Sequence, residues 1–392
     1  MRMHDLSRFH FTVHNDLQID AVISGQLREI AEELLALLGD RLTAVLVAGG
    51  FGRGEGGIVR NGDSIRPIND YDLYLVVKNL RKTRREFGER IEGIAQRLSL
   101  QFGIKQIDMG LVSRWQLWIP RNSVTRYEAK EGHQIVYGPP KMCIRSIKAA
   151  HIPLKEGTQY FSTRGGGLLI ARYILENRER LDNMPWFENF SIEMNKAGIA
   201  LGDAELIERG EYHWSYRERL KRFKALPREA GMKDDGQAIR PVYEAAVGQK
   251  LDPRFQPDPE HDLEKEWMEM TDLFIGRFLV FEGNRFRQPF TDLGEYEAFI
   301  GRSSFNLGGR LYSRLYRMYS GAKSSRSPDQ NRLLVFLLLD GVKNAGTLQR
   351  AERLLGMPKG DPSANRERWL AAVGSLLKQW HPEGIVAKLL VD

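Results

Sequence analysis

The chain has 392 residues, which is enough for two or three domains that each have a hydrophobic core. A hydrophobic fraction of 42% and a charged fraction of 28% are typical of globular proteins and exclude a mainly disordered chain. The single cysteine, Cys143, excludes an internal disulfide and a cysteine-rich zinc site, while the formal net charge of +7 permits a polyanionic partner without requiring one.

The sequence predicts neither a secretion signal nor a membrane-spanning helix. Residues Met1–His10 are polar and lack the apolar core of a signal peptide. The longest apolar run, Leu333–Leu339, is too short to cross a bilayer. We therefore expect a cytoplasmic protein without a membrane partner.

The first 150 residues alternate between helical and strand-like patterns. The predicted elements are, in chain order, a helix over 21–39, strands over Thr43–Ala48 and Tyr71–Val77, a helix over Thr83–Leu100 and a strand over Ile104–Val112. A Gly-rich loop, Gly49–Gly57, follows the first strand. This order predicts a mixed domain of helices and strands over residues 1–150.

The remainder, residues 151–392, is predicted to be helical. Helical spacing is found over Leu168–Glu179, Ser191–Arg209, Leu263–Glu282, Phe305–Ser320, Arg332–Val342 and Asn365–Trp380. The five prolines of Leu226–Pro259 predict a long loop or linker, so the helical region could divide into two subdomains near 226–260. Three successive glycines, Gly165–Gly167, favour a flexible connection that precedes a helix.

Three aspartates are the candidates for chemistry. Residues two apart on a strand point to the same face, so Asp70 and Asp72 should project together. Asp108 lies on another predicted strand that could pair beside theirs. Three gathered carboxylates repel one another unless divalent cations bind among them, and oxygen ligands favour Mg²⁺ or Mn²⁺. Two such cations roughly 3.5–4 Å apart can assist an in-line displacement at phosphorus.

The Gly-rich loop before these aspartates suits phosphate binding. Gly49 and Gly50 leave backbone N–H groups accessible to phosphate oxygens, and Arg53 could add a charge-assisted contact. The loop does not have the G-x-G-x-x-G spacing of a dinucleotide site, and no Gly-Lys-Ser/Thr follows it as in a P-loop. Arg53 as a surface cation remains the alternative.

The loop and the carboxylates together resemble the DNA polymerase β-like nucleotidyltransferase superfamily. The run Gly49-Gly50-Phe51-Gly52-Arg53-Gly54-Glu55 resembles its Gly-Ser-x-x-Arg-Gly-Glu signature, and Asp70-Tyr71-Asp72 is similar to its Asp-x-Asp metal motif. Asp108 is similar to the third carboxylate. The resemblance covers roughly residues 40–112. It departs from the family at Gly50, where a serine is usual, and in the longer segment between Gly50 and Asp70.

This resemblance implies an α+β protein, in which a nucleotidyltransferase domain with a mixed sheet is followed by a helical C-terminal region. It implies that Asp70 and Asp72 ligate the nucleotide-bound metal and share the second, while Asp108 completes the second site and helps to deprotonate the acceptor. Two Mg²⁺ ions are the implied cofactor, with Mn²⁺ as an alternative. A second resemblance, to the helical domain of such enzymes, implies that Lys196, Ser215 and Tyr216 contact the triphosphate.

The function implied is transfer of an NMP or dNMP from a nucleoside triphosphate, ATP or dATP, to an acceptor hydroxyl with release of pyrophosphate. A nucleic acid such as tRNA, an oligonucleotide or a nucleotide is the expected acceptor, as in tRNA-modifying toxins, second-messenger synthases and oligonucleotide-synthesising enzymes. A small molecule or a protein as acceptor is the alternative, and a protein partner is not excluded. From another class, a catalytically silent nucleotide-binding regulator remains open. Two basic segments, Arg81–Arg85 and Arg310–Arg317, could bind nucleic acid, although a solvated helix start and helix packing are the simpler interpretations.

Overall fold

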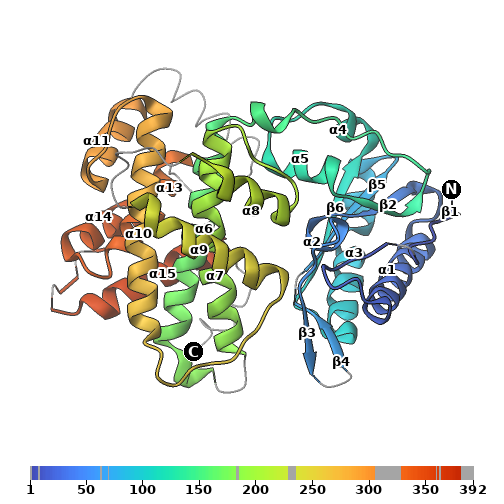
Figure 1. Ribbon diagram of the computed structural model, residues 1–392, viewed down its shortest axis with the longest axis horizontal. Helices are drawn as coiled ribbons and strands as arrows, with labels where there is room; N and C mark the ends of the chain where they lie inside the picture. Colours follow the sequence, from blue (N-terminus) through green and yellow to red (C-terminus); the bar gives the residue numbers. More distant parts are fainter. Residues whose placement is uncertain are drawn as a thin grey trace. The chain divides into compact units, whose positions relative to one another are not determined.

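The structure is a computed structural model of the chain. It describes all residues except 1, 8, 62–63, 69, 182–184, 228–234, 305–327, 359, 362 and 381–392. Within this part of the chain the protein is mostly helical with one mixed sheet, which confirms the α+β class (Figure 1). The predicted helix Phe305–Ser320 and the basic segment Arg310–Arg317 lie outside the described residues. None of the described helices combines the length and the apolar character that a membrane span requires.

The contacts divide the chain into two compact units. The first unit comprises Met1–Glu156, Arg209–Pro227 and Glu244–Arg254, and the second comprises Gly157–Glu208, Arg228–Tyr243 and Phe255–Asp392. The segments 209–227 and 244–254 therefore pack in the first unit, although they lie in the part of the sequence predicted to form the helical region.

The first unit is built on a five-stranded sheet with the order β1-β7-β2-β5-β6. Its strands are β1 (Arg2–Met3), β2 (Leu42–Val47), β5 (Tyr71–Val77), β6 (Ile107–Ser113) and β7 (Gln134–Gly138). The pair β5–β6 is parallel, and the other pairs are antiparallel. A separate hairpin, β3 (Ile58–Asn61) and β4 (Ser64–Pro67), occupies the segment between β2 and β5. The three predicted strands are thus confirmed, whereas β1, β7 and the hairpin were not predicted.

One face of the sheet is covered by two long helices, α1 (Leu17–Leu38) and α3 (Leu80–Phe102). Apolar residues of α1 such as Ile23 and Leu27 form one core with Val45, Leu73 and other inward residues of the strands. Both predicted helices begin a few residues earlier than expected, because Asp16 and Asn79 cap them with their side chains.

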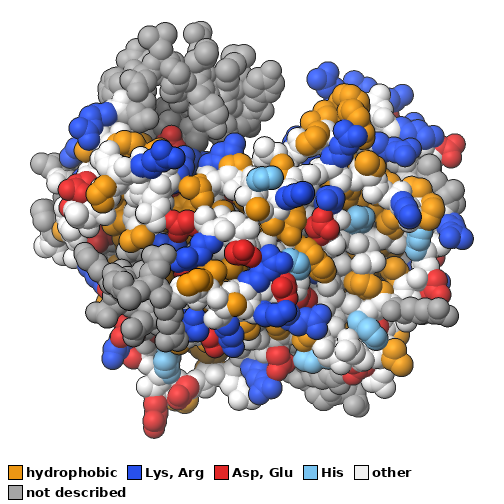
Figure 2. All heavy atoms as spheres, turned by 45° about the horizontal axis from the view of Figure 1, so that its top comes forward, with side chains coloured by type: hydrophobic (Ala, Val, Ile, Leu, Met, Phe, Trp, Pro, Cys, Tyr) orange, Lys and Arg blue, Asp and Glu red, His pale blue; other side chains and the backbone are white. Residues whose placement is uncertain are grey.

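The opposite face carries the alternate residues of the same strands. Leu46 of β2 and Val76 of β5 form a smaller core with Leu117 of the short helix α4 (Arg114–Trp118) and with Ile144. Over the part of the first unit that holds α4, hydrophobic side chains are bordered by Lys and Arg side chains at the surface (Figure 2). Two further helices of this unit are α2 (Gly49–Gly52) and α5 (Val124–Glu131), and α8 (Tyr216–Ala225) comes from the later segment.

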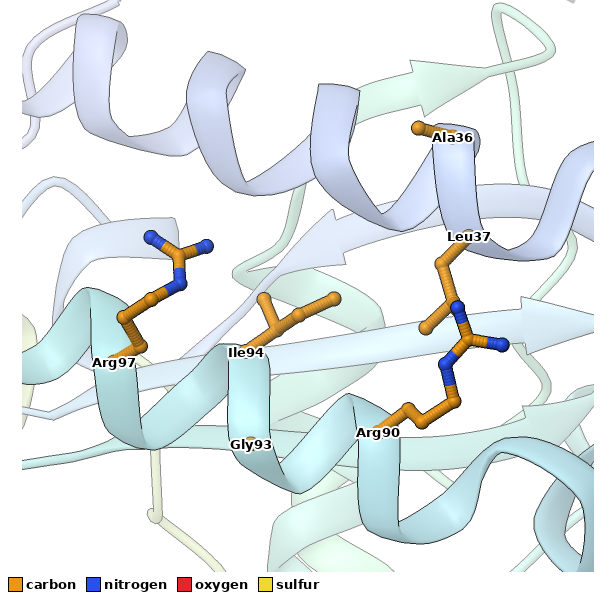
Figure 3. A pocket seen from close by; sticks show the side chains of 6 residues that line it. All are labelled: Ala36, Leu37, Arg90, Gly93, Ile94 and Arg97. Carbon is orange, nitrogen blue, oxygen red and sulfur yellow. The ribbon is translucent and has the colours of Figure 1, made fainter.

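A shallow surface groove runs between α1 and α3 (Figure 3). It is lined by Ala36, Leu37, Arg90, Gly93, Ile94 and Arg97. Because these two helices cover the other face of the sheet, the groove lies away from α4. Its lining includes no acid, and Arg97 is paired with Glu33.

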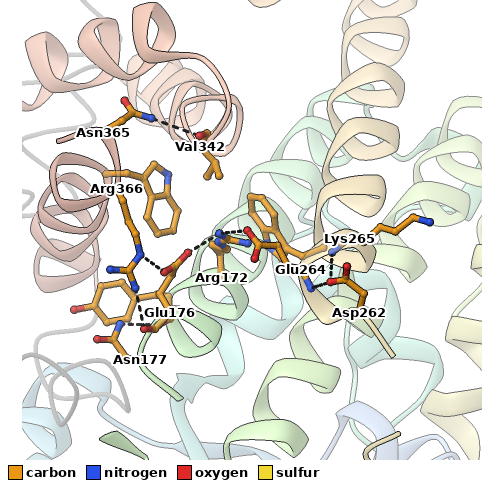
Figure 4. Close-up of polar contacts among 12 residues, drawn as sticks. Arg172, Glu176, Asn177, Asp262, Glu264, Lys265, Val342, Asn365 and Arg366 are labelled. Carbon is orange, nitrogen blue, oxygen red and sulfur yellow. Dashed lines mark hydrogen bonds and ion pairs between the residues drawn. The ribbon is translucent and has the colours of Figure 1, made fainter. Parts of the chain in front are cut away.

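The second unit is helical. Its helices are α6 (Leu154–Glu176), α7 (Trp186–Glu208), α10 (Leu263–Phe286), α11 (Leu293–Ser304), α13 (Pro328–Asp340), α14 (Ala345–Leu355) and α15 (Asn365–Trp380), with α6 beginning three residues inside the first unit. Stacked rings fill its core, among them Phe278 and Phe336 with centroids 3.6 Å apart. Arg172 joins α6 to α10 through Glu264 (2.7 Å), and Arg366 joins α15 to α6 through Glu176 (2.5 Å) (Figure 4).

Two sequence predictions for the helical part are wrong. The segment Leu226–Pro259 is not one long loop, because α9 (Asp235–Leu251) occupies its centre with Pro241 inside the helix. The residues Ile239, Tyr243, Ala246 and Val247 are buried, and their helical spacing was obscured by the prolines. The triple glycine 165–167 lies within α6 rather than before a helix, where a Cβ on Gly165 would come within 2.9 Å of Val335.

Candidate functional site

The predicted carboxylates lie on or just before two neighbouring strands. In the parallel β5–β6 pair, the register places Asp72 directly beside Asp108, and Asp70 comes just before β5. Asp72 and Asp108 alternate with the buried residues Tyr71, Leu73 and Ile107, so both project to the face opposite α1 and α3. The structure thus sets Asp72 beside Asp108, and Asp70 is near enough for its charge to raise the pKa of Asp72.

The surroundings of Asp72 disfavour the charged form of its carboxyl. Desolvation is the main cause and the neighbouring charges of Asp108 and Asp70 add to it, so that the pKa of Asp72 rises to about 6. The cations Arg53 and Lys250 act in the opposite direction. Solvent still reaches Asp72, so protein atoms displace only part of the water around the carboxyl. Desolvation also raises the pKa of Asp108, against a hydrogen bond from Gln106.

The donor chemistry at this edge suits a hard divalent cation, because all three side chains offer carboxylate oxygens. Within the part of the chain that the structure describes, however, no three His, Cys, Asp or Glu side chains converge as a ready set of metal ligands. Three ionised carboxylates repel one another, so their close approach would require a cation among them. Asp70, Asp72 and Asp108 would hold such an ion.

Gly49 lies directly against Asp72. Its φ of 61° is in the left-handed region, and a Cβ at this position would come within 1.8 Å of Asp72 Oδ2. The neighbouring Ala48 N donates to the Asp72 carbonyl oxygen (2.8 Å). Gly49 and Gly50 then open the single turn of α2, so their backbone stands beside the carboxylate without any side chain between them. Only glycine fits at position 49, which is a local reason for the Gly-rich loop.

Arg53 is buried in an ion-pair network rather than exposed. Its Nη1 lies 3.1 Å from Glu128 Oε2, and Glu128 Oε1 accepts from Arg219 Nη2 (2.9 Å) and from the Tyr212 hydroxyl (2.6 Å). The Tyr216 ring lies 5.0 Å from the Arg53 guanidinium. Burial lowers the pKa of Arg53, but the larger combined effect of Glu128, Tyr212 and Tyr216 raises it. The pKa is therefore above its ordinary value, and the guanidinium stays charged. Arg53 therefore contributes a fixed positive charge near Asp72.

Ser215 and Tyr216 are held by Glu55, a buried residue of the Gly-rich loop to which the sequence analysis gave no role. Glu55 Oε1 accepts from the Ser215 hydroxyl (2.6 Å), and Oε2 accepts from Tyr216 N (2.8 Å). Ser215 is also the N-cap of α8 and accepts from Glu218 N (3.3 Å). Two predicted triphosphate contacts are thus engaged in fixing α8 to the loop.

Lys196 is on α7 of the second unit, where its Nζ pairs with Glu193 Oε1 (2.8 Å). A different lysine, Lys250 of α9, belongs to the first unit. Its Nζ lies 5.8 Å from the centre of the Tyr216 ring, and its charge lowers the pKa of Asp72. Lys250 was not predicted as a site residue, because it lies in the segment predicted to be a loop and no motif marks it.

No family model matches the chain, and no match was found among curated proteins or solved structures. The interpretation of the site therefore depends on its residues and their geometry.

Proposed function

We propose that the protein is a metal-dependent nucleotidyltransferase with a polymerase β-like catalytic domain. It moves an NMP or dNMP from a nucleoside triphosphate, ATP or dATP, to an acceptor hydroxyl. The observation that carries the proposal is the parallel register that sets Asp72 beside Asp108, with Asp70 adjacent and the Gly49 backbone against the Asp72 carboxylate. Carboxylates beside a side-chain-free turn provide for cations and for phosphate oxygens at the same place.

Each residue has a defined part in the proposed reaction. Asp70 and Asp72 would hold the ion that accompanies the triphosphate, and the backbone at Gly49 and Gly50 would face its phosphate oxygens. Bound Mg²⁺ or Mn²⁺ supplies charge stabilisation for the attacking and leaving oxygens. The acceptor oxygen bonds to the α-phosphorus, the bond to pyrophosphate breaks, and the hydroxyl proton passes to the Asp108 carboxylate. Because desolvation raises the pKa of Asp108, this carboxylate is a better base than an ordinary aspartate.

Arg53 and the α8 segment support this site from behind. The Arg53–Glu128–Arg219 network leaves an excess of positive charge close to the carboxylates, and Lys250 adds to it. A triphosphate carries negative charge that such a field attracts. Ser215 and Tyr216 act on the nucleotide through the Glu55-bound position of α8, and Lys196 stays a proposed triphosphate contact.

The test is transfer of label from each α-³²P-labelled NTP and dNTP, with Mg²⁺ or Mn²⁺ and with bulk tRNA, oligonucleotides or no added acceptor. Asp72→Asn should abolish transfer, whereas Asp40→Asn, at an exposed aspartate of the same unit, should leave it unchanged. A wild-type protein that transfers label to no acceptor and behaves like Asp72→Asn throughout would overturn the proposal. If the protein binds the labelled nucleotide but transfers it to no acceptor, it is instead a catalytically silent nucleotide-binding regulator.

A further inference from the structure

The two chain segments around α4 form a surface of unusual composition. Residues 109–127 and 132–155 together contain seven Lys and Arg and no Asp or Glu, a charge equal to the formal net charge of the whole chain. Trp115 and Trp118 are 63% and 41% exposed, although tryptophan is normally among the more buried side chains. Exposed aromatic rings among uncompensated cations indicate a binding surface rather than an ordinary solvated face.

The two segments are joined into one surface. Arg145 N donates to the Leu117 carbonyl oxygen (2.9 Å), and Arg121 and Ser146 form a parallel β-bridge. The rings of Trp115 and Trp118 are stacked, with centroids 5.0 Å apart and planes at 24°. The Arg145 guanidinium lies 4.3 Å from the centre of the Trp118 ring. We call this the Trp–Arg surface, and it comprises Arg114, Trp115, Trp118, Arg121, Lys141 and Arg145.

The positive charges of this surface are not neutralised by the residues that the structure describes. Within the described part of the chain, none of its four cations takes part in an ion pair with an Asp or Glu. The neighbouring Arg126 donates to a carbonyl oxygen, that of Gln116 (3.2 Å). Burial and the charge of Arg121 lower the pKa of Arg126, against an opposing effect of Tyr74. Cations that repel one another at a surface are stabilised by an anion from outside.

The Trp–Arg surface and the carboxylates share one face of the sheet. Leu117 and Ile144 anchor the surface on the face that carries Asp72 and Asp108, at the other end of β5 and β6. Ser113, the last residue of β6, lies five positions after Asp108, a length of about 17 Å along a strand. A stacked nucleic-acid strand covers that length with roughly five nucleotides.

We propose that the Trp–Arg surface binds single-stranded nucleic acid, so that a strand end reaches the carboxylates as the acceptor. The acceptor part of this inference rests on the proposed function, whereas the binding part does not. The more exposed Trp115 offers a ring face to an unpaired base, Trp118 is stacked on Trp115 and contacts the Arg145 guanidinium, and the arginines and lysine meet the phosphates. Paired bases would have no free ring face, which favours a single strand over a duplex.

Binding is tested by fluorescence anisotropy of a labelled 12-nucleotide single-stranded RNA of mixed sequence with the full chain, over a range of salt concentrations. Trp115→Ala should weaken binding by roughly 5- to 150-fold, the effect of losing one stacked base. Arg145→Ala should lower the slope of log affinity against log salt by about 0.7 if that side chain meets one phosphate. The controls are Leu100→Ala on α3, at a residue 84% exposed, and Lys265→Ala on α10, with a side chain 70% exposed; each should bind as the wild type does.

The only cysteine gives an independent readout. Cys143 is exposed and lies between Lys141 and Arg145, so bound RNA should slow its alkylation by a maleimide. In Trp115→Ala, the same RNA concentration should protect it less.

Three results would overturn the inference. The first is no RNA binding by the wild-type protein at 50 mM salt. The second is equal binding by Trp115→Ala and the two control variants. The third is preference for vesicles with anionic lipid over RNA, which would assign the surface to a membrane. Asp72→Asn separates the two proposals, because it should retain RNA binding whether or not the wild-type protein transfers nucleotides.

Discussion

At the scale of single residues, the contact between Gly49 and Asp72 shows how a backbone position controls a carboxylate. The strand β2 ends at Val47, and the chain must then turn so that α2 begins beside the Asp72 side chain. A turn with positive φ at Gly49 achieves this and places a bare backbone against the carboxyl. The glycine is therefore required both by conformation and by space.

A pair of alanine substitutions separates these two requirements. Gly49→Ala should destabilise the protein and abolish nucleotidyl transfer, because its Cβ would displace the Asp72 carboxyl. Gly103→Ala has nearly the same φ, 65° against 61°, but its Cβ would meet no atom within 4 Å. It should cost about 1 kcal/mol of unfolding free energy through strain alone and leave transfer intact. Urea denaturation and the transfer assay measure the two effects, and equal loss of activity in both variants would contradict this account.

The raised pKa of Asp72 predicts a pH-dependent penalty in the metal-free protein. Below pH 3.8 the carboxyl is neutral in both the folded and the unfolded states and costs nothing. As the pH rises from 3.8 to about 6, the carboxyl is ionised in the unfolded state but still protonated in the folded state. The folded state therefore loses relative stability over this range. Asp72→Asn should therefore gain stability over the wild type between pH 4 and pH 7 in EDTA.

Urea denaturation of both proteins at pH 4.5, 6.0 and 7.5 measures this difference. Added Mg²⁺ should raise the stability of the wild type at pH 7.5 and have little effect on Asp72→Asn, because a ligand stabilises the state that binds it. A difference between the two proteins that stays constant with pH would show that neighbouring carboxylates do not disfavour the charge of Asp72.

At the scale of elements, the helices and strands that were predicted are those with a clear local periodicity of apolar residues. The alternation in Tyr71–Val77 placed Asp72 on the face opposite Leu73 and Leu75, and the structure has that strand with the same bounds. The helices α1 and α3 followed from their apolar stripes. Contacts between distant residues, such as Glu55 with Ser215, which are 160 positions apart, were not predicted. No local pattern encodes such a pair, because each partner alone looks like an ordinary polar residue.

Glu55 is the residue that fixes α8 to the Gly-rich loop, so its carboxylate should matter to that helix. Glu55→Gln replaces one oxygen by an NH₂ group that faces donors, and we expect a loss of about 1.5–3 kcal/mol of unfolding free energy. The amide hydrogens of Tyr216 and Arg217 should exchange faster in this variant. Glu211→Gln, at a half-exposed side chain paired with Arg222, is the control and should change stability by less than about 1 kcal/mol. Unchanged exchange at α8 would show that Glu55 is not its anchor.

The helix α9 has a proline in its interior, which is why the sequence favoured a loop. Pro241 is exposed and cannot donate a backbone hydrogen bond, whereas Ile239, Tyr243 and Val247 are buried and hold the helix in place. Tertiary packing thus outweighs the local preference. Pro241→Ala should raise the unfolding free energy by about 2 kcal/mol, because the cost of an interior proline exceeds the entropy lost from the unfolded chain.

A second substitution on the same helix tests whether helix propensity is the cause. Gly248→Ala, where a Cβ meets nothing within 4 Å, should add about 1 kcal/mol and combine additively with Pro241→Ala. Thermal unfolding measures all three variants. A lower melting temperature for Pro241→Ala would indicate that the packing of α9 depends on the proline.

At the scale of the whole molecule, the first unit is assembled from three separate stretches of the chain. The Gly-rich loop, α5 and α8 are far apart in sequence, yet they meet in the Arg53–Glu128–Arg219 network. Arg219 is fully buried, so its charge is tolerated only because Glu128 and the rings of Tyr212 and Tyr216 surround it. The chain must therefore return from the second unit before the first unit is complete.

This return predicts that residues 1–156 do not form a stable domain alone. Without residues 209–227, Glu55 would lose the donors of Ser215 and Tyr216, and Arg53 would keep Glu128 but lose the ring beneath it. We expect the fragment 1–156 to unfold at a lower urea concentration than the full chain, with a broad transition.

A synthetic peptide of residues 209–227 should bind the fragment and restore part of the stability. The same peptide with Ser215→Ala lacks the hydroxyl that donates to Glu55 and should restore less. Circular dichroism against urea, with and without each peptide, measures this. A fragment that unfolds as sharply and at the same midpoint as the full chain, regardless of peptide, would mean that the sheet and its two covering helices suffice, and that the α8 segment serves the site without contributing to the fold.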